Sequence, residues 1–342
     1  LSRVEGQASG NPFDANDPLP RHGMLRKKYR AIFVRDNLLE GTCMSEVVNT
    51  KDLHPEVWKL FDRYVHGLID RRGFLDGAGK YAVGGVTAVG ILEALSPKYA
   101  EAQQVAPNDP RIKTERIDVS SPDGYGKVRA LLARPANATG RIPAIIVIHE
   151  NRGLTPHIED VVRRAAVAGF MAIGPDALTS LGGYPGTDEV GVEMQRKLDQ
   201  AKMMADFLAT ARYVKTRPDS TGRLGATGFC FGGGVVNNLA VQLGADLQAG
   251  VPFYGGAPRA EDVPKIKAAM LIQYAQDDER INGMWPAYEA ALKANRIAYQ
   301  MFQYPGTQHG FHNDTTPRFS KDAAALAWQR TVDHFKKHLT TS

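Results

Sequence analysis

The chain has 342 residues, a length that suits one large α/β domain or two smaller domains. Hydrophobic residues make up 43% and charged residues 23%, which is typical of a globular protein and excludes disordered, collagen-like and coiled-coil chains. The 42 Lys and Arg residues are nearly balanced by 37 Asp and Glu residues, so the net charge of +5 does not favour a nucleic-acid partner. No apolar run reaches the roughly 18 residues of a membrane-spanning helix, so we expect no membrane span.

The first part of the chain changes character at His54. Residues 1–53 are rich in turn formers and charge and predict an irregular arm. From His54 to Ile69, apolar residues recur every three or four positions, which predicts an amphipathic helix. We therefore interpret residues 1–110 as an N-terminal arm with a helical extension, and residues 111–342 as a separate catalytic domain.

A twin-arginine pattern follows the predicted amphipathic helix. Arg71 and Arg72 precede an apolar stretch over 78–95, and small residues near Ala102 are spaced as at a cleavage site. This order is typical of a twin-arginine export signal and predicts a periplasmic protein. Some 70 residues precede the arginines, however, so the alternative is a cytoplasmic protein in which 70–95 is a pair of helices packed on the main domain.

From residue 111, strands and helices alternate. The segments 114–120 and 127–134 predict an antiparallel hairpin. The continuous apolar run at 142–149 predicts a strand buried on both faces of a parallel sheet. Further predicted strands are 170–173, 223–227, 249–253, 269–274 and 299–303, and predicted helices are 158–168, 192–215, 233–243, 285–294 and 323–338. This alternation predicts an α/β fold, a mostly parallel sheet with helices on both faces.

The strongest local motif surrounds Cys230. A predicted strand runs into Gly228-Phe229-Cys230-Phe231-Gly232 and then into a helix, which is the pattern of a nucleophile elbow with cysteine in place of serine. The glycines are needed because the turn is tight and its neighbours approach closely. Cys230 would lie at a helix N-terminus, where the helix dipole favours a thiolate. The alternative is an inert buried cysteine.

A thiol nucleophile needs a base and an acid that orients the base. His309 follows a predicted strand and is the candidate base, with His312 as its local rival. Asp278 follows the strand 269–274 and is the candidate acid, with Asp277 next to it. His309 and His312 could also bind a metal, but no third ligand of suitable spacing accompanies them, so we predict no metal and no other cofactor.

These motifs together resemble the dienelactone hydrolase family of the α/β-hydrolase superfamily. The resemblance covers roughly residues 110–340 and rests on four motifs in the right order. They are Ile148-His149-Glu150-Asn151-Arg152-Gly153-Leu154, Gly228 to Gly233, Gln276-Asp277-Asp278-Glu279-Arg280-Ile281 and His309-Gly310-Phe311. The resemblance implies an α/β-hydrolase fold, and its alignment selects Asp278 over Asp277 as the acid.

The resemblance also implies further site roles. Glu150 would approach the nucleophilic sulfur and accept its proton when substrate enters. The backbone N–H groups of Phe231 and Asn151 would form an oxyanion hole. Arginines that would hold a substrate carboxylate are absent from two expected regions, and Arg152 and Arg280 are the candidates to substitute for them. Arg152, Tyr184 and Phe311 are our candidates for substrate contacts, and we expect uncharged or larger esters to react at least as well as dienelactone.

The sequence thus predicts a hydrolase of carboxylic esters or lactones. Cys230, His309 and Asp278 would form its triad and pass through a covalent acyl-enzyme. Its partner would be a small-molecule substrate. The sequence does not decide between a monomer and a homo-oligomer. The alternatives are a thiol acyltransferase or peptidase, and a catalytically silent hydrolase-fold binding protein.

Overall fold

The chain divides into two units, Leu1–Met44 and Ser45–Ser342. The computed structural model describes residues 48–83, 86–99 and 102–340, all of which belong to the second unit. Most of the predicted N-terminal arm and part of the predicted cleavage site therefore lie outside the described residues. Among the residues that are described, no helix combines the length and apolarity needed to cross a membrane.

An eight-stranded mixed sheet is the centre of this unit, and its order is β1-β2-β4-β3-β5-β6-β7-β8. The pairs β1–β2 and β2–β4 are antiparallel and all other pairs are parallel, which confirms the predicted α/β fold and the predicted hairpin. The strands are β1 (Ile112–Ser121), β2 (Gly126–Pro135), β3 (Ile142–Ile148), β4 (Met171–Pro175), β5 (Ser220–Phe229), β6 (Ala249–Phe253), β7 (Ala269–Asp277) and β8 (Tyr299–Gln308).

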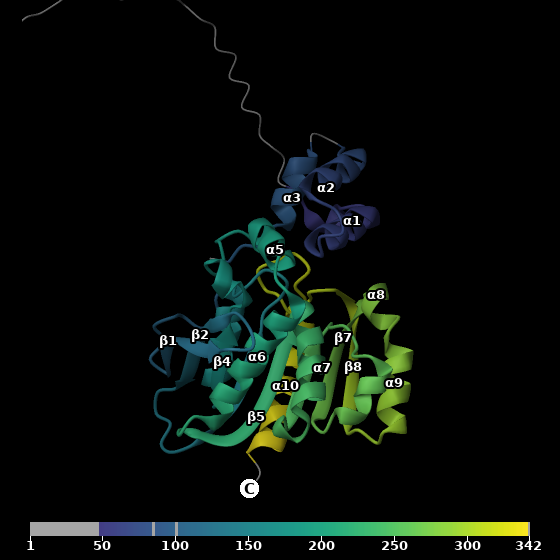
Figure 1. The fold of residues 1–342 in the computed structure, drawn as a ribbon. Coiled ribbons are helices and arrows are strands. Elements are labelled where there is room, and N and C mark those ends of the chain that lie inside the picture. The colour runs from purple at the N-terminus through teal and green to yellow at the C-terminus, as the bar shows by residue number, and fades with distance from the viewer. Residues whose placement is uncertain (1–47, 84–85, 100–101, 341–342) are drawn as a thin grey trace, which may run out of the picture. The chain divides into compact units, whose positions relative to one another are not determined.

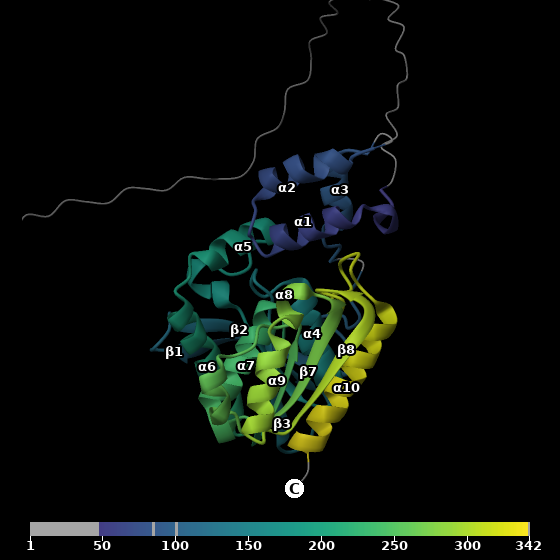
Figure 2. The same ribbon diagram turned by 90° about the vertical axis from the view of Figure 1, so that its right-hand side faces the viewer.

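Helices cover both faces of the sheet (Figures 1 and 2). On one face, α4 and α10 share a buried apolar cluster with the strands, and on the other face α6, α7 and α9 share a second cluster. These helices are α4 (Pro156–Val167), α6 (Gln200–Thr216), α7 (Phe231–Leu243), α9 (Trp285–Ala294) and α10 (Lys321–Leu339). Burial on both faces explains why β3 is a continuous apolar run, because neither side of this strand meets water.

The predicted helix over 192–215 is wrong, because the structure contains two helices there. They are α5 (Asp188–Arg196) and α6, which begins at Gln200. The side chain of Asp199 accepts a hydrogen bond from the backbone N–H of Lys202 at 2.9 Å and caps α6. An N-terminal cap of this kind starts a new helix where the apolar periodicity alone suggested continuation.

The N-terminal helices have an apolar core of their own. They are α1 (Pro55–Val65), α2 (Arg71–Ala78) and α3 (Ala88–Leu95), with short 3-10 turns at Thr50–Asp52 and Gly79–Tyr81. Their shared core consists of Val57, Phe61, Phe74, Ala78, Ile91, Leu92 and Leu95. The predicted helical segment over 70–95 is thus two separate helices, and the side chains of Asp70 and Thr87 cap them.

The remaining short elements lie in the connections between the longer helices and strands. They are the 3-10 turns Ala177–Leu181, Gly244–Asp246 and Ala260–Lys265, and the helix α8 (Glu279–Asn282). Strands β3, β5, β7 and β8 are parallel, so their carboxyl ends lie at one edge of the sheet. In open α/β sheets this edge is where ligands bind.

Candidate active site

Cys230 occupies a strained turn between β5 and α7. Its φ is +56°, a left-handed conformation that is rare for a residue with a side chain. The neighbouring glycines are required sterically, because a Cβ at Gly228 would lie 2.4 Å from the backbone oxygen of Gly232, and one at Gly232 would lie 2.4 Å from that of Ile148. This geometry is that of the predicted nucleophile elbow, and it leaves the residue Cys230 8% exposed.

His309 and Asp278 lie beside this turn, on the loops that follow β8 and β7. Nδ1 of His309 is 2.5 Å from Oδ2 of Asp278, and both side chains are buried. The Cys230 sulfur and a ring nitrogen of His309 lie within 4.8 Å of each other. The structure therefore brings together the three residues that the sequence proposed as nucleophile, base and acid. Asp277, the neighbouring alternative, is exposed at the end of β7.

The ionisation of these groups is coupled. Burial by itself would raise the pKa of the Cys230 thiol, but the charges of His309 and His66 lower it well below the usual value. Burial would likewise lower the pKa of His309, but the charge of Cys230 and the hydrogen bond to Asp278 raise it. The arrangement therefore favours a thiolate paired with an imidazolium, which is the reactive form of a cysteine nucleophile.

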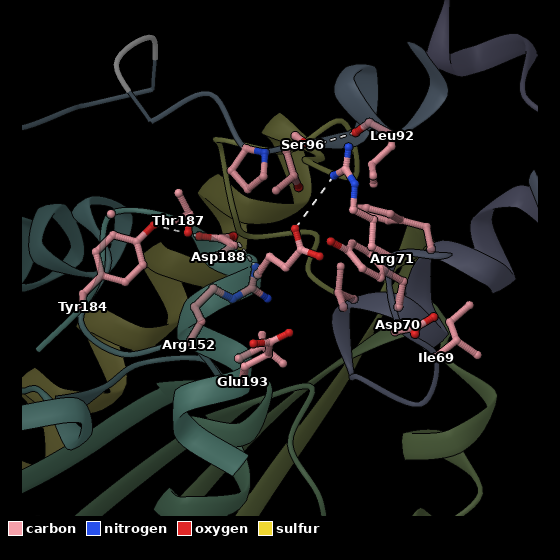
Figure 3. A pocket seen from close by; sticks show the side chains of 18 of the residues that line it. Ile69, Asp70, Arg71, Leu92, Ser96, Arg152, Tyr184, Thr187, Asp188 and Glu193 are labelled. Atoms are coloured by element: carbon pink, nitrogen blue, oxygen red, sulfur yellow. Dashed lines mark hydrogen bonds and ion pairs between the residues drawn. The ribbon is translucent and has the colours of Figure 1, made fainter. Parts of the chain in front are cut away.

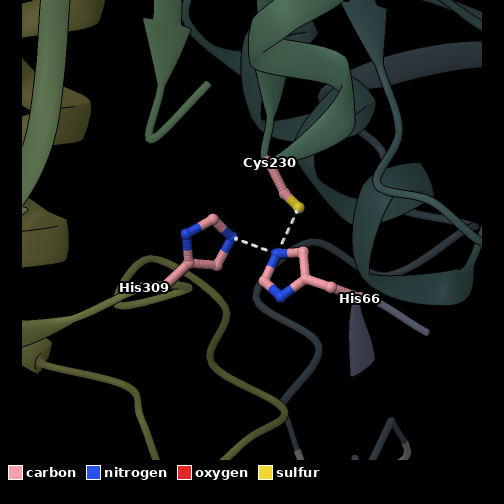
Figure 4. A group of neighbouring side chains, drawn as sticks. All are labelled: His66, Cys230 and His309. Atoms are coloured by element: carbon pink, nitrogen blue, oxygen red, sulfur yellow. Dashed lines mark hydrogen bonds between the residues drawn. The ribbon is translucent and has the colours of Figure 1, made fainter. Parts of the chain in front are cut away.

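The sequence did not point to His66, the residue that follows α1 (Figure 4). Its Nε2 lies 3.4 Å from the sulfur of Cys230 and 3.2 Å from Nε2 of His309. The same atom lies 3.1 Å from a guanidinium nitrogen of Arg280. Nε2 of His66 thus contacts both Cys230 and His309, the residues that the sequence predicted as nucleophile and base.

Asp62 holds the other side of the His66 ring. Nδ1 lies 2.7 Å from the backbone oxygen of Asp62 and 3.3 Å from its carboxylate. Burial would lower the pKa of His66, but the charge of Cys230 and the hydrogen bond to Asp62 raise it to about 10. No local pattern could have identified this residue, because 164 positions separate it from Cys230 in the chain.

A cleft of about 1040 Å³ opens from the sulfur. Its lining includes Phe231 and Asn151, the two residues whose backbone N–H groups were predicted to hold an oxyanion. Phe231 is the first residue of α7, so its N–H has no acceptor within the helix. The cleft is otherwise lined by apolar side chains, amides and two arginines: Met203, Met204, Phe207, Val235, Ile281, Gln200, Asn238, Gln242, Arg259 and Arg280.

Glu150 lies after β3 and is buried, as its predicted role requires. Its carboxylate accepts a hydrogen bond from Asn313 at 3.2 Å and lies 3.8 Å from Nε of Arg152. Asn313 and Arg152 are thus neighbours of this carboxylate in the structure. The predicted approach of Glu150 to the sulfur of Cys230 stays a prediction.

Arg152 and Tyr184 line a second cavity of about 370 Å³, not the cleft at Cys230 (Figure 3). Arg152 pairs with Asp188 at 2.5 Å, and the hydroxyl groups of Tyr184 and Tyr99 donate to the same carboxylate at 2.9 and 2.6 Å. The charge of Arg152 is therefore already compensated within the protein. Arg152 follows Glu150 closely in the sequence, but it does not line the cleft at Cys230.

Phe311, the third predicted substrate contact, has no exposed surface and packs against Tyr254 and Tyr304. His312, the rival base, is also buried, and its ring stacks on Phe229 with 4.8 Å between centroids. Neither residue lines the cleft. Both fill the core beneath the site, so their contribution to the site is support for the loop that carries His309.

Comparison with known proteins agrees with this geometry. A family model described as "Dienelactone hydrolase family" matches residues 128–339, and a second, described as "YqhI-like", matches residues 44–83. The first match covers both β5 and the loop of His309, and the second covers His66, Arg71 and Arg72. The fold and the first match define a hydrolase of the α/β-hydrolase class. The chain belongs to the dienelactone hydrolase family.

Individual relatives are similar to different shares of the chain. The "Putative carboxymethylenebutenolidase" of Synechocystis sp. is 34% identical over 251 residues, which are 67% of this chain and 98% of the relative. "Putative hydrolase fragment YghX" of Escherichia coli is 51% identical over 114 residues, 33% of this chain and 97% of the relative. A solved "Putative Dienelactone Hydrolase" from Klebsiella pneumoniae is 27% identical with a TM-score of 0.58, covering 66% of this chain and 99% of its own.

Proposed function

We propose that this hydrolase cleaves carboxylic esters or lactones, with Cys230 as nucleophile, His309 as acid and base, and Asp278 as the group that orients His309. The observation that carries the proposal is the placement of these three side chains at the carboxyl ends of β5, β8 and β7, with a cleft opening from the sulfur. The names of the relatives support the same reaction class.

In the first step, the Cys230 thiolate attacks the carbonyl carbon of the substrate, and the carbonyl π electrons move to oxygen. The backbone N–H groups of Phe231 and Asn151 stabilise this oxyanion. Each donor of this kind is typically worth about 3–4 kcal/mol in the transition state. The tetrahedral intermediate then breaks the C–O bond, the leaving alkoxide takes the proton of the His309 imidazolium, and an acyl-thioester remains.

In the second step, neutral His309 takes a proton from water while the water oxygen attacks the thioester. The C–S bond breaks, the acid leaves, and the thiolate and imidazolium are restored. Asp278 holds Nδ1 of His309 throughout, so that Nε2 faces the reacting atoms. Glu150 would take part only at the start, as an acceptor for the thiol proton in any enzyme molecule whose Cys230 is protonated.

The decisive experiment combines kinetics with detection of the intermediate. Wild-type protein should hydrolyse short-chain aryl esters, and mass spectrometry after a rapid acid quench should find the acyl group on Cys230. Cys230→Ala should lose essentially all turnover and remain folded, whereas Cys43→Ser provides the matched thiol control and should keep both activity and acylation.

Other outcomes separate the alternatives. Transfer of the acyl group to an added amine or thiol in preference to water would indicate an acyltransferase. Cleavage of peptides but not esters would indicate a peptidase. Full ester hydrolysis by Cys230→Ala would refute the mechanism, and no reaction with any substrate class would favour a binding protein.

A further inference from the structure

The nucleophile, the base and His66 form a cluster of three potential metal ligands. One ligand atom from each of Cys230, His309 and His66 lies within 4.8 Å of the other two. Figure 4 shows that the two imidazole rings meet through their nitrogens in front of the sulfur. Among the described residues, this is the one group of three or more His, Cys, Asp or Glu side chains placed to hold an ion.

The spacing is close to that of a tetrahedral zinc site. With Zn–N near 2.0–2.1 Å and Zn–S near 2.3 Å, neighbouring ligand atoms lie about 3.3–3.6 Å apart. The two nitrogens are 3.2 Å apart, and the sulfur is 3.4 Å from the nearer one. Both distances are within about 0.2 Å of the tetrahedral values. The third edge, between Cys230 and His309, is at most 4.8 Å and would close by rotation of the cysteine side chain.

Both histidines are oriented as metal-binding histidines usually are. Zinc-bound imidazoles donate their second N–H to a carboxylate or a backbone carbonyl, which fixes the ring and leaves the other nitrogen for the metal. His309 has Asp278 at 2.5 Å from Nδ1, and His66 has the backbone oxygen of Asp62 at 2.7 Å. The Nε2 atoms of both histidines therefore face the same point, because a contact at Nδ1 fixes the orientation of each ring.

The donor set selects the kind of ion. One thiolate and two imidazoles suit zinc, whereas magnesium and calcium prefer oxygen ligands. The fourth position would open toward the cleft, as in zinc sites that keep a water molecule. Arg280 approaches Nε2 of His66 and would oppose a cation, but it is exposed and can turn toward solvent.

We propose that Zn²⁺ binds at Cys230, His309 and His66 and holds the enzyme in an inactive closed state. The ion would occupy the lone pairs that the reaction uses and would fasten the N-terminal helices to the nucleophile. From the sequence, His309 and His312 were the candidate metal ligands, and no third ligand of suitable spacing accompanied them. The structure supplies a different set, because His66 comes from the other end of the chain. The inhibition rests on the proposed hydrolase function, whereas the binding does not.

The test measures binding without substrate. Reduced, metal-free protein is titrated with Zn²⁺ against a chromophoric chelator, and with Co²⁺ while absorption is recorded. We expect one equivalent of Zn²⁺ per chain, and with Co²⁺ a sulfur-to-cobalt charge-transfer band with the intense visible bands of a tetrahedral ion. His66→Gln should weaken Zn²⁺ binding about 100-fold or more, because loss of an outer contact alone usually costs 10- to 100-fold. Asp62→Asn keeps the backbone contact and removes only the charge of the carboxylate that lies 3.3 Å from Nδ1 of His66, so it should weaken binding less than His66→Gln does.

The matched control is His54→Asn, which removes an exposed imidazole from the same helical segment and retains a side-chain cap for α1. It should bind Zn²⁺ as wild type does, and circular dichroism should show that all variants are folded. Equal Zn²⁺ affinity in wild type and His66→Gln would overturn the proposal, as would the absence of stoichiometric binding. An enzyme that binds Zn²⁺ through His66 but hydrolyses no ester would refute the proposed function and leave the metal site standing.

Discussion

His66 lies directly beside the Cys230 sulfur, so under the proposed mechanism its removal should make the metal-free enzyme faster. Before a carbonyl can reach the sulfur, Nε2 of His66 has to leave both Cys230 and His309. If the closed arrangement is the more stable one, only the fraction of molecules that is open can bind substrate productively. The apparent specificity constant is then reduced by that fraction.

The size of the effect follows from the contacts that are lost on opening. Hydrogen bonds to charged groups contribute about 1.5–3 kcal/mol each in proteins. The His66 side chain is 13% exposed, so solvent screens its contact with the thiolate only in part. Taking one such contact as the net cost of opening, the open fraction is about one in ten to one in a hundred and fifty. His66→Ala should therefore raise kcat/KM by about 10- to 100-fold.

The assay is hydrolysis of p-nitrophenyl acetate by protein that has been stripped of metal and is kept in chelator. His54→Asn is again the matched control and should behave as wild type. A fall of tenfold or more in kcat/KM of folded His66→Ala would refute this reasoning, because it would mean that His66 assists the reaction. An unchanged value would mean that the closed arrangement has no net stability in solution.

The same contact gives a pH dependence of definite sign. The pKa of His66 is about 10 in the folded protein and about 6.5 for an unperturbed histidine. Because the folded value is the higher one, its stabilising contribution is fully present below about pH 6.5 and is lost as the pH rises toward 10. The difference in free energy of unfolding between wild type and His66→Ala, measured with urea, should shrink over this range. A difference that grows with pH contradicts the assignment.

Three further predictions concern the thiol, the second cavity and substrate charge. Because the pKa of Cys230 is lowered well below its usual value, its alkylation by iodoacetamide should fall less with decreasing pH than that of an ordinary thiol, and His309→Ala should make the fall steeper even though His66 still lowers this pKa. Asp188→Asn should destabilise the protein by about 3 kcal/mol in thermal or urea unfolding, since it leaves the buried guanidinium of Arg152 without its 2.5 Å partner. Arg280→Met should lower kcat/KM for an anionic lactone more than for a neutral ester of similar size, and an equal effect on both would exclude Arg280 as an anion contact.

Local steric demands made the tight turn at Cys230 predictable from the sequence. A left-handed residue between a strand and a helix needs glycine where neighbouring backbones approach, and Gly228 and Gly232 record that demand in the sequence itself. Strands such as β3 are readable for a similar reason, because burial on both faces leaves a run of apolar residues. His309 and Asp278 follow strands of the same kind, and parallel pairing brings their strand ends to one edge.

Contacts that depend on the direction of a side chain could not be predicted from the sequence. Arg152 follows Glu150 closely in the chain, yet its guanidinium pairs with Asp188 in the second cavity. Phe311 stands two residues after His309 but packs into the core. The interruption at Asp199 was missed for a different reason, since apolar periodicity continues across the break and only the cap marks it.

His66 shows how an extension can change the chemistry of a site without altering the triad. With His66 withdrawn, the sulfur of Cys230 would face the cleft without an imidazole of the N-terminal extension in front of it. With His66 in place, the sulfur and Nε2 of His309 face a third donor at distances that suit either a shared proton or a zinc ion. Under the two proposals made above, substrate, proton and Zn²⁺ compete for one set of lone pairs. Because the third donor belongs to the N-terminal helices, whatever moves these helices also decides which of the three competitors the nucleophile meets.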